Sequence, residues 1–243
     1  MIELIRVDWP VSIPVEAWVS TRSGGVSLGA YRSLNLATHV GDDPMAVQEN
    51  RRRLHEHLRL TEPIVWMSQV HGTHVATPDQ GPVCADAVYS NKPGQVCAVL
   101  TADCLPILVA NAQGTEVAAI HAGWRGLVAG VLEAALAKFG TATHQLYAWL
   151  GPAIGPKSFE VGPEVRQAFM NSNIDSDKAF IPGHSDRFYA DLYELARIRL
   201  KNAGVDAISG GDWCTVRDAE RFFSYRRDGQ TGRMACLIRV LSA

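Results

Sequence analysis

The chain has 243 residues, of which 47% are hydrophobic and 20% are charged, and its formal net charge is -2. This size fits one large domain, because a single core can grow to roughly 250 residues before division into domains is favoured. The balanced charge provides no basic stripe for a phosphate backbone. We therefore predict one catalytic domain over residues 1–243 and no nucleic-acid partner.

The N-terminal segment mixes charged and apolar side chains. Glu3, Arg6 and Asp8 interrupt its apolar residues, so it lacks the apolar run of a signal peptide. No stretch approaches the ~18 consecutive apolar residues that cross a bilayer. Five scattered cysteines without a CxxC spacing favour a reducing compartment over a disulfide framework. We expect a cytoplasmic protein that does not associate with membranes.

Short apolar runs typical of strands dominate the first half of the chain. They cover residues 17–20, 64–67, 86–89, 96–100, 105–110 and 117–120. A turn-forming segment at 110–114 separates the last two runs. These two runs therefore predict an antiparallel hairpin.

Helices are fewer but carry clearer end signals. We predict them over residues 44–58, 126–139, from 163 onward, and 191–202. Asp43 suits the N-cap of the first helix and Pro44 its first turn. A broad apolar stripe marks the second helix, and Gly140 ends it.

The C-terminal region predicts a hairpin of residues 222–226 and 234–240, joined by a glycine-containing turn at 228–232. Strands and helices alternate without a regular βαβ rhythm along the chain. This mixture favours an α+β sandwich with largely antiparallel sheets over a doubly wound parallel sheet.

Three segments place metal-binding side chain types where strands meet loops. His71 lies in SQVHG, Cys104 in TADCLP and His121 in IHAGWRG. Their long spacings exclude a zinc finger, whose ligands sit on short local loops. Two imidazoles and one thiolate suit zinc or copper and leave a fourth position for water or substrate. The pattern predicts a catalytic metal site.

Each of these residues also has an ordinary interpretation. An isolated histidine is usually a surface or hydrogen-bonded residue, and a cysteine among apolar neighbours is usually a small core residue. A Cys-His hydrolase, with Cys104 as nucleophile and His121 or His71 as base, is the catalytic alternative. We favour the metal because a dyad uses one imidazole, whereas a metal site uses both.

Further blocks extend the pattern over nearly the whole chain. In order they are STRSGGVS, SLNL, ENR, QVHG, ADA, TADCLP, HAGWRG, LGPAIG, FEV and FSYRRD. With these blocks the chain resembles the YfiH-like laccase-domain family, also called the polyphenol oxidase family, which is associated with purine nucleoside phosphorylase activity. The resemblance implies a layered α/β/β/α sandwich similar to that of a Cys-His deamidase toxin.

The resemblance also implies an activity and a site. Metal ligands and catalytic residues are expected at His71, Cys104 and His121, with zinc as the cofactor and copper as the alternative. The implied reactions are phosphorolysis of adenosine, inosine, guanosine and methylthioadenosine, and hydrolytic deamination of adenosine. We expect Arg22 to meet phosphate, and Asn35 and Gln69 to orient ribose or the metal ligands.

Other functions stay open at this stage. They are copper-dependent oxidation of phenols, amidase-like editing of a peptidoglycan precursor, and a non-catalytic role in which the metal only staples the fold. A requirement for inorganic phosphate separates phosphorolysis from the others. The oligomeric state is left undecided.

Overall fold

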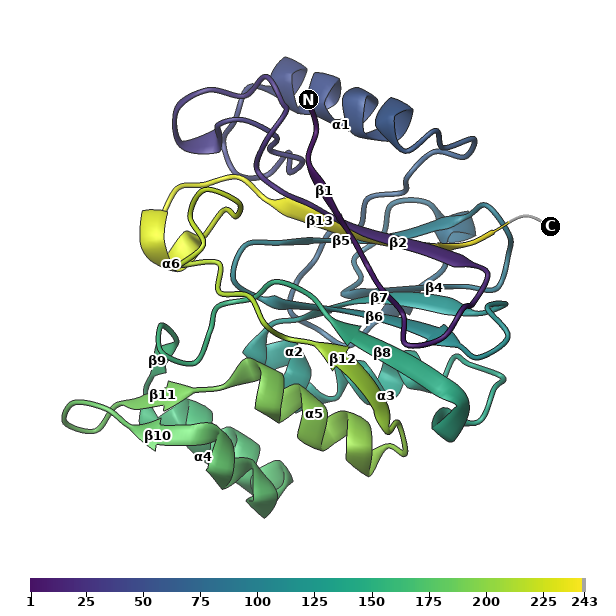
Figure 1. Cartoon of the computed structure of the whole chain (residues 1–243). Coiled ribbons are helices and arrows are strands. Elements are labelled where there is room, and N and C mark those ends of the chain that lie inside the picture. Colours follow the sequence, from purple (N-terminus) through teal and green to yellow (C-terminus); the bar gives the residue numbers. More distant parts are fainter. Residues whose placement is uncertain (242–243) are drawn as a thin grey trace.

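The computed structural model describes residues 1–241, and two stacked β-sheets form its centre (Figure 1). The first sheet has the strand order β1 (Leu4–Arg6), β2 (Val15–Ser20), β13 (Met234–Val240) and β5 (Val96–Thr101). The second has the order β12 (Ala207–Gly210), β8 (Leu146–Leu150), β6 (Leu105–Asn111), β7 (Val117–Ala122), β4 (Ala87–Ser90) and β3 (Val75–Ala76). Most neighbouring strands are antiparallel, but β12–β8 and β3–β4 are parallel.

Helices cover both outer faces of the stack. On the four-stranded sheet lies α1 (Pro44–His57), whose Leu54 packs on Ala98 and Leu237. The opposite layer contains α2 (Trp124–Ala129), α3 (Val131–Leu136), α4 (Pro163–Ser172) and α5 (Leu192–Asn202). The predicted α/β/β/α sandwich is therefore confirmed.

The remaining elements are short. A three-stranded sheet has the order β10 (Phe180–Pro182), β11 (Phe188–Ala190) and β9 (Glu160–Val161). Four 3-10 helices, η1 (Gly29–Tyr31), η2 (Pro78–Gln80), η3 (Thr143–Gln145) and η4 (Ile174–Ala179), and the helix α6 (Tyr225–Asp228) complete the described chain. Within residues 1–241 no helix is both long and apolar enough to cross a membrane.

Successive side chains of the central strands point alternately into two apolar cores, one between the sheets and one under the helices. Cys97 and Val99 of β5 face Leu108 and Ala119 of the second sheet, and all four are buried. The neighbouring residues Ile107 and Ile120 point the other way, toward the helices. Strands buried on both faces are apolar throughout, as the strong runs at 96–100 and 105–110 indicated.

The predicted helix over 126–139 is wrong in its limits and its continuity. It begins at Trp124, two residues earlier, and Gly130 divides it into α2 and α3. Gly130 has φ 101°, in the left-handed region that interrupts a right-handed helix and that glycine adopts without a steric penalty. An apolar stripe continues across the break, so periodicity alone could not detect it.

The predicted C-terminal hairpin is also wrong. Residues 222–226 do not pair with β13, which lies between β2 and β5 instead. Ser224 accepts a hydrogen bond from the Arg227 amide and caps α6. Residues 64–67 likewise form no strand, because no other strand pairs with them. Their apolar pattern arises because their side chains alternate between two apolar clusters.

The packing between the sheets gives a stability prediction. Leu108 is fully buried there, and Leu28 is 79% exposed on the surface. Leu108→Ala should lower the free energy of unfolding by about 2–5 kcal/mol, because a cavity forms where β6 meets the other sheet. Leu28→Ala is the matched control and should change it by less than about 0.5 kcal/mol. Urea unfolding measures both, and equal effects would contradict the layered core.

Candidate metal centre

The hairpin of β6 and β7 brings Cys104 close to His121. Leu105 pairs with Ala122 and Pro106 with His121 across the antiparallel ladder. Cys104 immediately precedes this ladder, so the start of one strand lies at the end of the other. A separation of 17 residues in the sequence thus becomes a local contact.

His71 lies beside Cys104 and His121 on a loop that the Asp86 carboxylate fixes. Asp86 is fully buried and accepts hydrogen bonds from the backbone amides of Val70, His71 and Gly72, at 3.2, 2.9 and 2.7 Å. His71 has φ 61°, a left-handed conformation that is uncommon for a residue with a side chain. The three amide bonds keep the loop in this conformation.

The same carboxylate orients His121. Oδ1 of Asp86 lies 2.8 Å from Nδ1 of His121, and the His121 backbone amide donates to the Asp86 carbonyl at 2.7 Å. Because Nδ1 is engaged, Nε2 of His121 is the nitrogen left to face the cluster. A carboxylate behind a histidine in this way fixes the ring and its tautomer in metal sites.

The three side chains fit one tetrahedral ion. Ligand atoms of His71, Cys104 and His121 all lie within 4.8 Å of one another, and Sγ of Cys104 is 3.6 Å from Nε2 of His71. Zinc–sulfur and zinc–nitrogen bonds at a tetrahedral angle would separate these two atoms by about 3.5 Å. The donor set and its spacing therefore suit zinc or copper.

Gly123 closes the cluster from the backbone side. A Cβ atom added there would lie 2.6 Å from Cδ2 of His71 and 3.0 Å from Sγ of Cys104. Any side chain at this position would displace a candidate ligand. Gly123 is needed because a side chain would not fit, and not for an unusual backbone conformation, since its φ is -63°.

Proton sharing within the cluster favours a thiolate. Burial raises the pKa of Cys104, but the charge and hydrogen bonds of His121 and His71 outweigh it and lower this pKa to about 6. Burial lowers the pKa of His121, whereas Cys104 and Asp86 raise it to about 9. Burial also raises the pKa of Asp86, yet His121 and the backbone amides hold it below its ordinary value.

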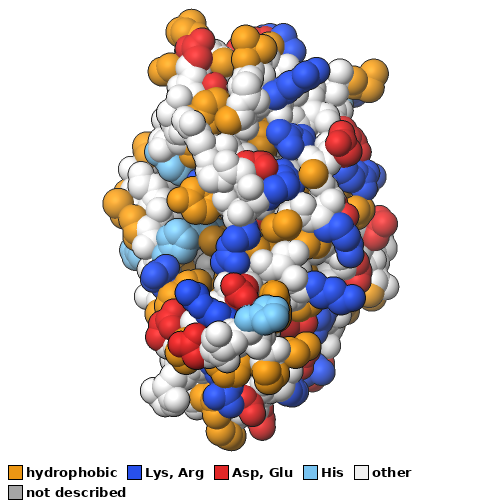
Figure 2. Space-filling view, turned by 90° about the vertical axis from the view of Figure 1, so that its left-hand side faces the viewer, with side chains coloured by type: hydrophobic (Ala, Val, Ile, Leu, Met, Phe, Trp, Pro, Cys, Tyr) orange, Lys and Arg blue, Asp and Glu red, His pale blue; other side chains and the backbone are white. Residues whose placement is uncertain are grey.

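A cavity of about 420 Å³ opens onto the three side chains. Its size lies within the range of small-molecule sites. Trp124, Phe159 and Tyr225 provide aromatic walls, and Arg226 and Arg233 reach it from the C-terminal part of the chain. Figure 2 turns the side of the molecule that carries α6 and β9 toward the viewer, and basic and histidine side chains gather across its middle.

The three residues predicted to bind substrate are placed differently from one another. Gln69 lines the cavity, but its amide pairs with the backbone N–H and carbonyl of Leu100, both at 2.7 Å. Arg22 and Asn35 do not line it. The Arg22 guanidinium donates to the carbonyls of Arg32 and Ala219 and lies over the Phe223 ring.

Asn35 does not line the cavity but bonds the backbone of Arg233, which does. It is fully buried, and its Oδ1 accepts the backbone amides of Ala37 and Arg233. Its Nδ2 donates to Asp42. Asn35 thereby fixes the segment that carries Arg233.

The sequence-based site omits several residues that the structure brings to the cluster or the cavity, among them Asp86, Asp103 and Arg233. Asp86 was part of a predicted strand, and an acidic residue in a strand gives no ligand signal by itself. Asp103 has φ 87° and receives the Thr215 hydroxyl and the Arg226 amide. Arg233 lies in a segment without a motif. The block ADA, which contains Asp86, and the block TADCLP, which contains Asp103, offered a hint for the other two.

Comparison with known proteins places the chain in a family. Residues 16–241 match the family described as multi-copper polyphenol oxidoreductase laccase. A Shigella flexneri protein named purine nucleoside phosphorylase YfiH is 55% identical over 98% of this chain and 99% of its own length. A Pseudomonas aeruginosa protein, also named a purine nucleoside phosphorylase, is 53% identical over 95% of this chain and 96% of its own length.

Solved structures agree with this relationship. A Neisseria meningitidis protein has a TM-score of 0.95 and 46% identity, covering 98% of this chain and 99% of its own. YlmD from Geobacillus stearothermophilus has a TM-score of 0.83 and 32% identity, covering 94% of this chain and 93% of its own. The chain belongs to the YfiH-like laccase-domain family.

Proposed function

We propose that this chain is a single-domain, metal-dependent purine nucleoside phosphorylase that also deaminates adenosine by hydrolysis. The observation that carries the proposal is the convergence of His71, Cys104 and His121 at the floor of a cavity of about 420 Å³. The names of relatives more than 50% identical over almost the full length support the phosphorylase activity. Adenosine, inosine, guanosine and methylthioadenosine are the proposed substrates.

His71, Cys104 and His121 would hold the metal, with zinc as the proposed ion. When bound, zinc acts as a Lewis acid that polarises oxygen atoms and lowers the pKa of water. Asp86 keeps His121 in the tautomer whose Nε2 faces the ion, and Gly123 leaves room for the ligands.

The rest of the cavity suits a purine nucleoside. Trp124, Phe159 and Tyr225 offer aromatic faces on which a purine can stack, which contributes about 1–3 kcal/mol per base in other proteins. In phosphorolysis, an oxygen of inorganic phosphate attacks the anomeric carbon of the ribose. The bond to the purine breaks, and the base leaves with the electron pair and takes up a proton. Free base and ribose 1-phosphate result.

A second candidate function uses the same cluster without a metal. Cys104, His121 and Asp86 form a chain of nucleophile, base and orienting carboxylate. Such a chain would suit amide hydrolysis, including the editing of a peptidoglycan precursor. It leaves His71 without a role, although Nε2 of His71 lies 3.6 Å from the sulfur. We therefore rank it second.

Copper-dependent oxidation of phenols ranks third. Within residues 1–241 one group of three or more histidine, cysteine or acidic side chains is spaced to hold an ion. A multi-copper oxidase requires further copper ligands beyond one such group. If oxidation were the activity, phenol turnover would rise with added copper and vanish with zinc.

The first test is whether nucleoside consumption requires phosphate. The metal-loaded protein should convert inosine to hypoxanthine and ribose 1-phosphate, and omission of phosphate should abolish the reaction. Cys104→Ala should lower kcat/KM by at least ~100-fold, because it removes one of three ligands. Chromatography of the bases measures turnover.

Cys84→Ala is the matched control, because Cys84 is exposed and lies outside the cavity lining. It should retain the wild-type rate. Full turnover by Cys104→Ala, or by protein freed of metal, would refute the proposal. Release of hypoxanthine from inosine at an equal rate without phosphate would likewise exclude phosphorolysis.

Alkylation tests the metal site independently of activity. In chelator-treated protein at pH 7, Cys104 should react with iodoacetamide much faster than Cys97 and Cys236, because burial raises the pKa of those two thiols. Its own pKa of about 6 makes it mostly thiolate at this pH. Added zinc should protect Cys104 and leave exposed Cys84 reactive. Peptide mass spectrometry locates the label, and lack of protection would contradict a zinc–sulfur bond.

Replacement of Asp86 tests the support behind the ligands. Asp86→Asn keeps the size of the side chain but removes the charge that faces His121 and the loop amides. Zinc affinity should fall by about 10–100-fold. Asp79→Asn, at an exposed carboxylate that bonds Lys92 and Gln95, should leave it unchanged. Competition with a chromogenic chelator measures both, and equal affinities would show that Asp86 does not support the site.

A further inference from the structure

Arg233 brings a positive charge to the cavity, where its guanidinium lies 6.0 Å from the centre of the Tyr225 ring. It is half-buried, and its Nη1 donates to the carbonyls of Thr231 and Gly232 at 2.9 and 3.0 Å. Within the part of the chain that the structure describes, it forms no ion pair. Burial lowers the pKa of Arg233, and the opposing effect of Cys104 and Asp103, which raise it, is smaller. A cation held in this way is prepared to receive an anion.

The backbone around Arg233 is fixed independently of any ligand. Its amide donates to Oδ1 of Asn35 at 3.0 Å, and its carbonyl accepts the Leu36 amide at 3.3 Å. Asn35 is itself buried and bonded to Asp42. The guanidinium is therefore presented to the cavity from a rigid segment, which lowers the entropy cost of binding.

Two more arginines line the same cavity without an acidic partner among the described residues. Arg226 donates through Nη1 to the Glu160 carbonyl at 3.0 Å, and Arg125 is exposed and lies over the Trp124 ring. Asp103 is the one carboxylate in the lining. Its two oxygens accept hydrogen bonds from the Thr215 hydroxyl and the Arg226 backbone amide, at 2.5 and 2.6 Å, and its charge acts on Arg233 without a direct ion pair.

We infer that Arg233 and Arg226 form the phosphate subsite of this cavity. The inference rests on the proposed phosphorolysis, in which the nucleoside is neutral and phosphate is the anionic reactant. The planar fork of a guanidinium matches two phosphate oxygens at once. Both arginines line the same cavity as Cys104 and the two histidines. Phosphate bound to the arginines would therefore lie in the same cavity as the glycosidic bond that breaks. Arg22, which lies outside the lining, is not part of this subsite.

The test separates phosphate binding from nucleoside binding. Arg233→Gln should raise the KM for phosphate by about 10–100-fold, because it removes charge-assisted hydrogen bonds. The KM for inosine and the zinc content should change by less than about threefold, within the scatter expected of an indirect effect. Arg233→Lys keeps the charge but loses the fork, so it should recover part of the phosphate affinity.

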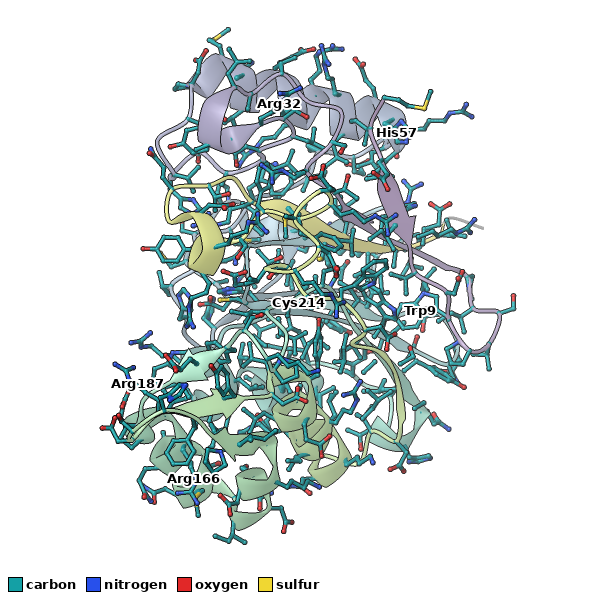
Figure 3. The ribbon with its side chains drawn as sticks, turned by 60° about the vertical axis from the view of Figure 1, so that its left-hand side comes forward. Trp9, Arg32, His57, Arg166, Arg187 and Cys214 are labelled. Atoms are coloured by element: carbon teal, nitrogen blue, oxygen red, sulfur yellow. The ribbon has the colours of Figure 1, made fainter. Side chains whose placement is uncertain are left out.

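Arg187→Gln is the matched control. Arg187 is exposed in the turn between β10 and β11, outside the cavity lining, and Figure 3 labels it on this projecting hairpin. It should keep the wild-type KM for phosphate. A fall in kcat for Arg233→Gln with an unchanged KM for phosphate would overturn the subsite. So would equal loss in the Gln and Lys variants together with a lower melting temperature, since that result identifies a structural role.

A direct binding measurement distinguishes failure of the subsite from failure of the proposed reaction. Inorganic phosphate is titrated calorimetrically into the metal-loaded protein without nucleoside. Binding by the wild type that is lost in Arg233→Gln supports the subsite even if inosine is not consumed, and the proposed reaction alone then fails. Phosphorolysis with equal phosphate binding by wild type and Arg233→Gln keeps the reaction and rejects the subsite.

Discussion

One buried carboxylate determines the geometry of the candidate metal centre. Asp86 joins the loop that carries His71 to the strand that carries His121, through three backbone amides and one imidazole. A buried charge is stable only when hydrogen bonds satisfy it, and here its partners are the segments that hold two ligands. The hydrogen bonds that stabilise the buried Asp86 carboxylate therefore also bring His71 and His121 together.

The ligands differ in how far the sequence could predict their meeting. Cys104 and His121 flank a predicted hairpin, and a hairpin brings its two ends together by local pairing. His71 has no such register, since it lies in a loop without a paired strand, and only its contact with Asp86 places it. His71 was predicted from its residue type and its place where a strand meets a loop, and the family resemblance agreed with that choice.

The limits of sequence-based prediction have the same cause elsewhere in the fold. The α+β class and the strands followed from strong apolar runs, because burial on one or two faces leaves a periodic pattern, whereas the α/β/β/α layering was implied by the family resemblance. The division at Gly130 and the packing of β13 between β2 and β5 depend on tertiary contacts that no local pattern records. The sequence did not predict Arg233 for this reason. Arg22, in a glycine-containing loop, was predicted to meet phosphate, but its guanidinium bonds the Ala219 carbonyl and lies outside the cavity lining.

The second imidazole of the site suits a metal better than a simple dyad. A Cys-His dyad needs a single imidazole that is free to move a proton between sulfur and substrate. Asp86 holds Nδ1 of His121, as the carboxylate of a triad also would, so the distinguishing feature is His71, whose Nε2 lies 3.6 Å from the same sulfur. A divalent cation would take all three side chains as ligands, with a fourth tetrahedral position for water or substrate. The arginines of the cavity then provide the charge that an anionic second reactant needs.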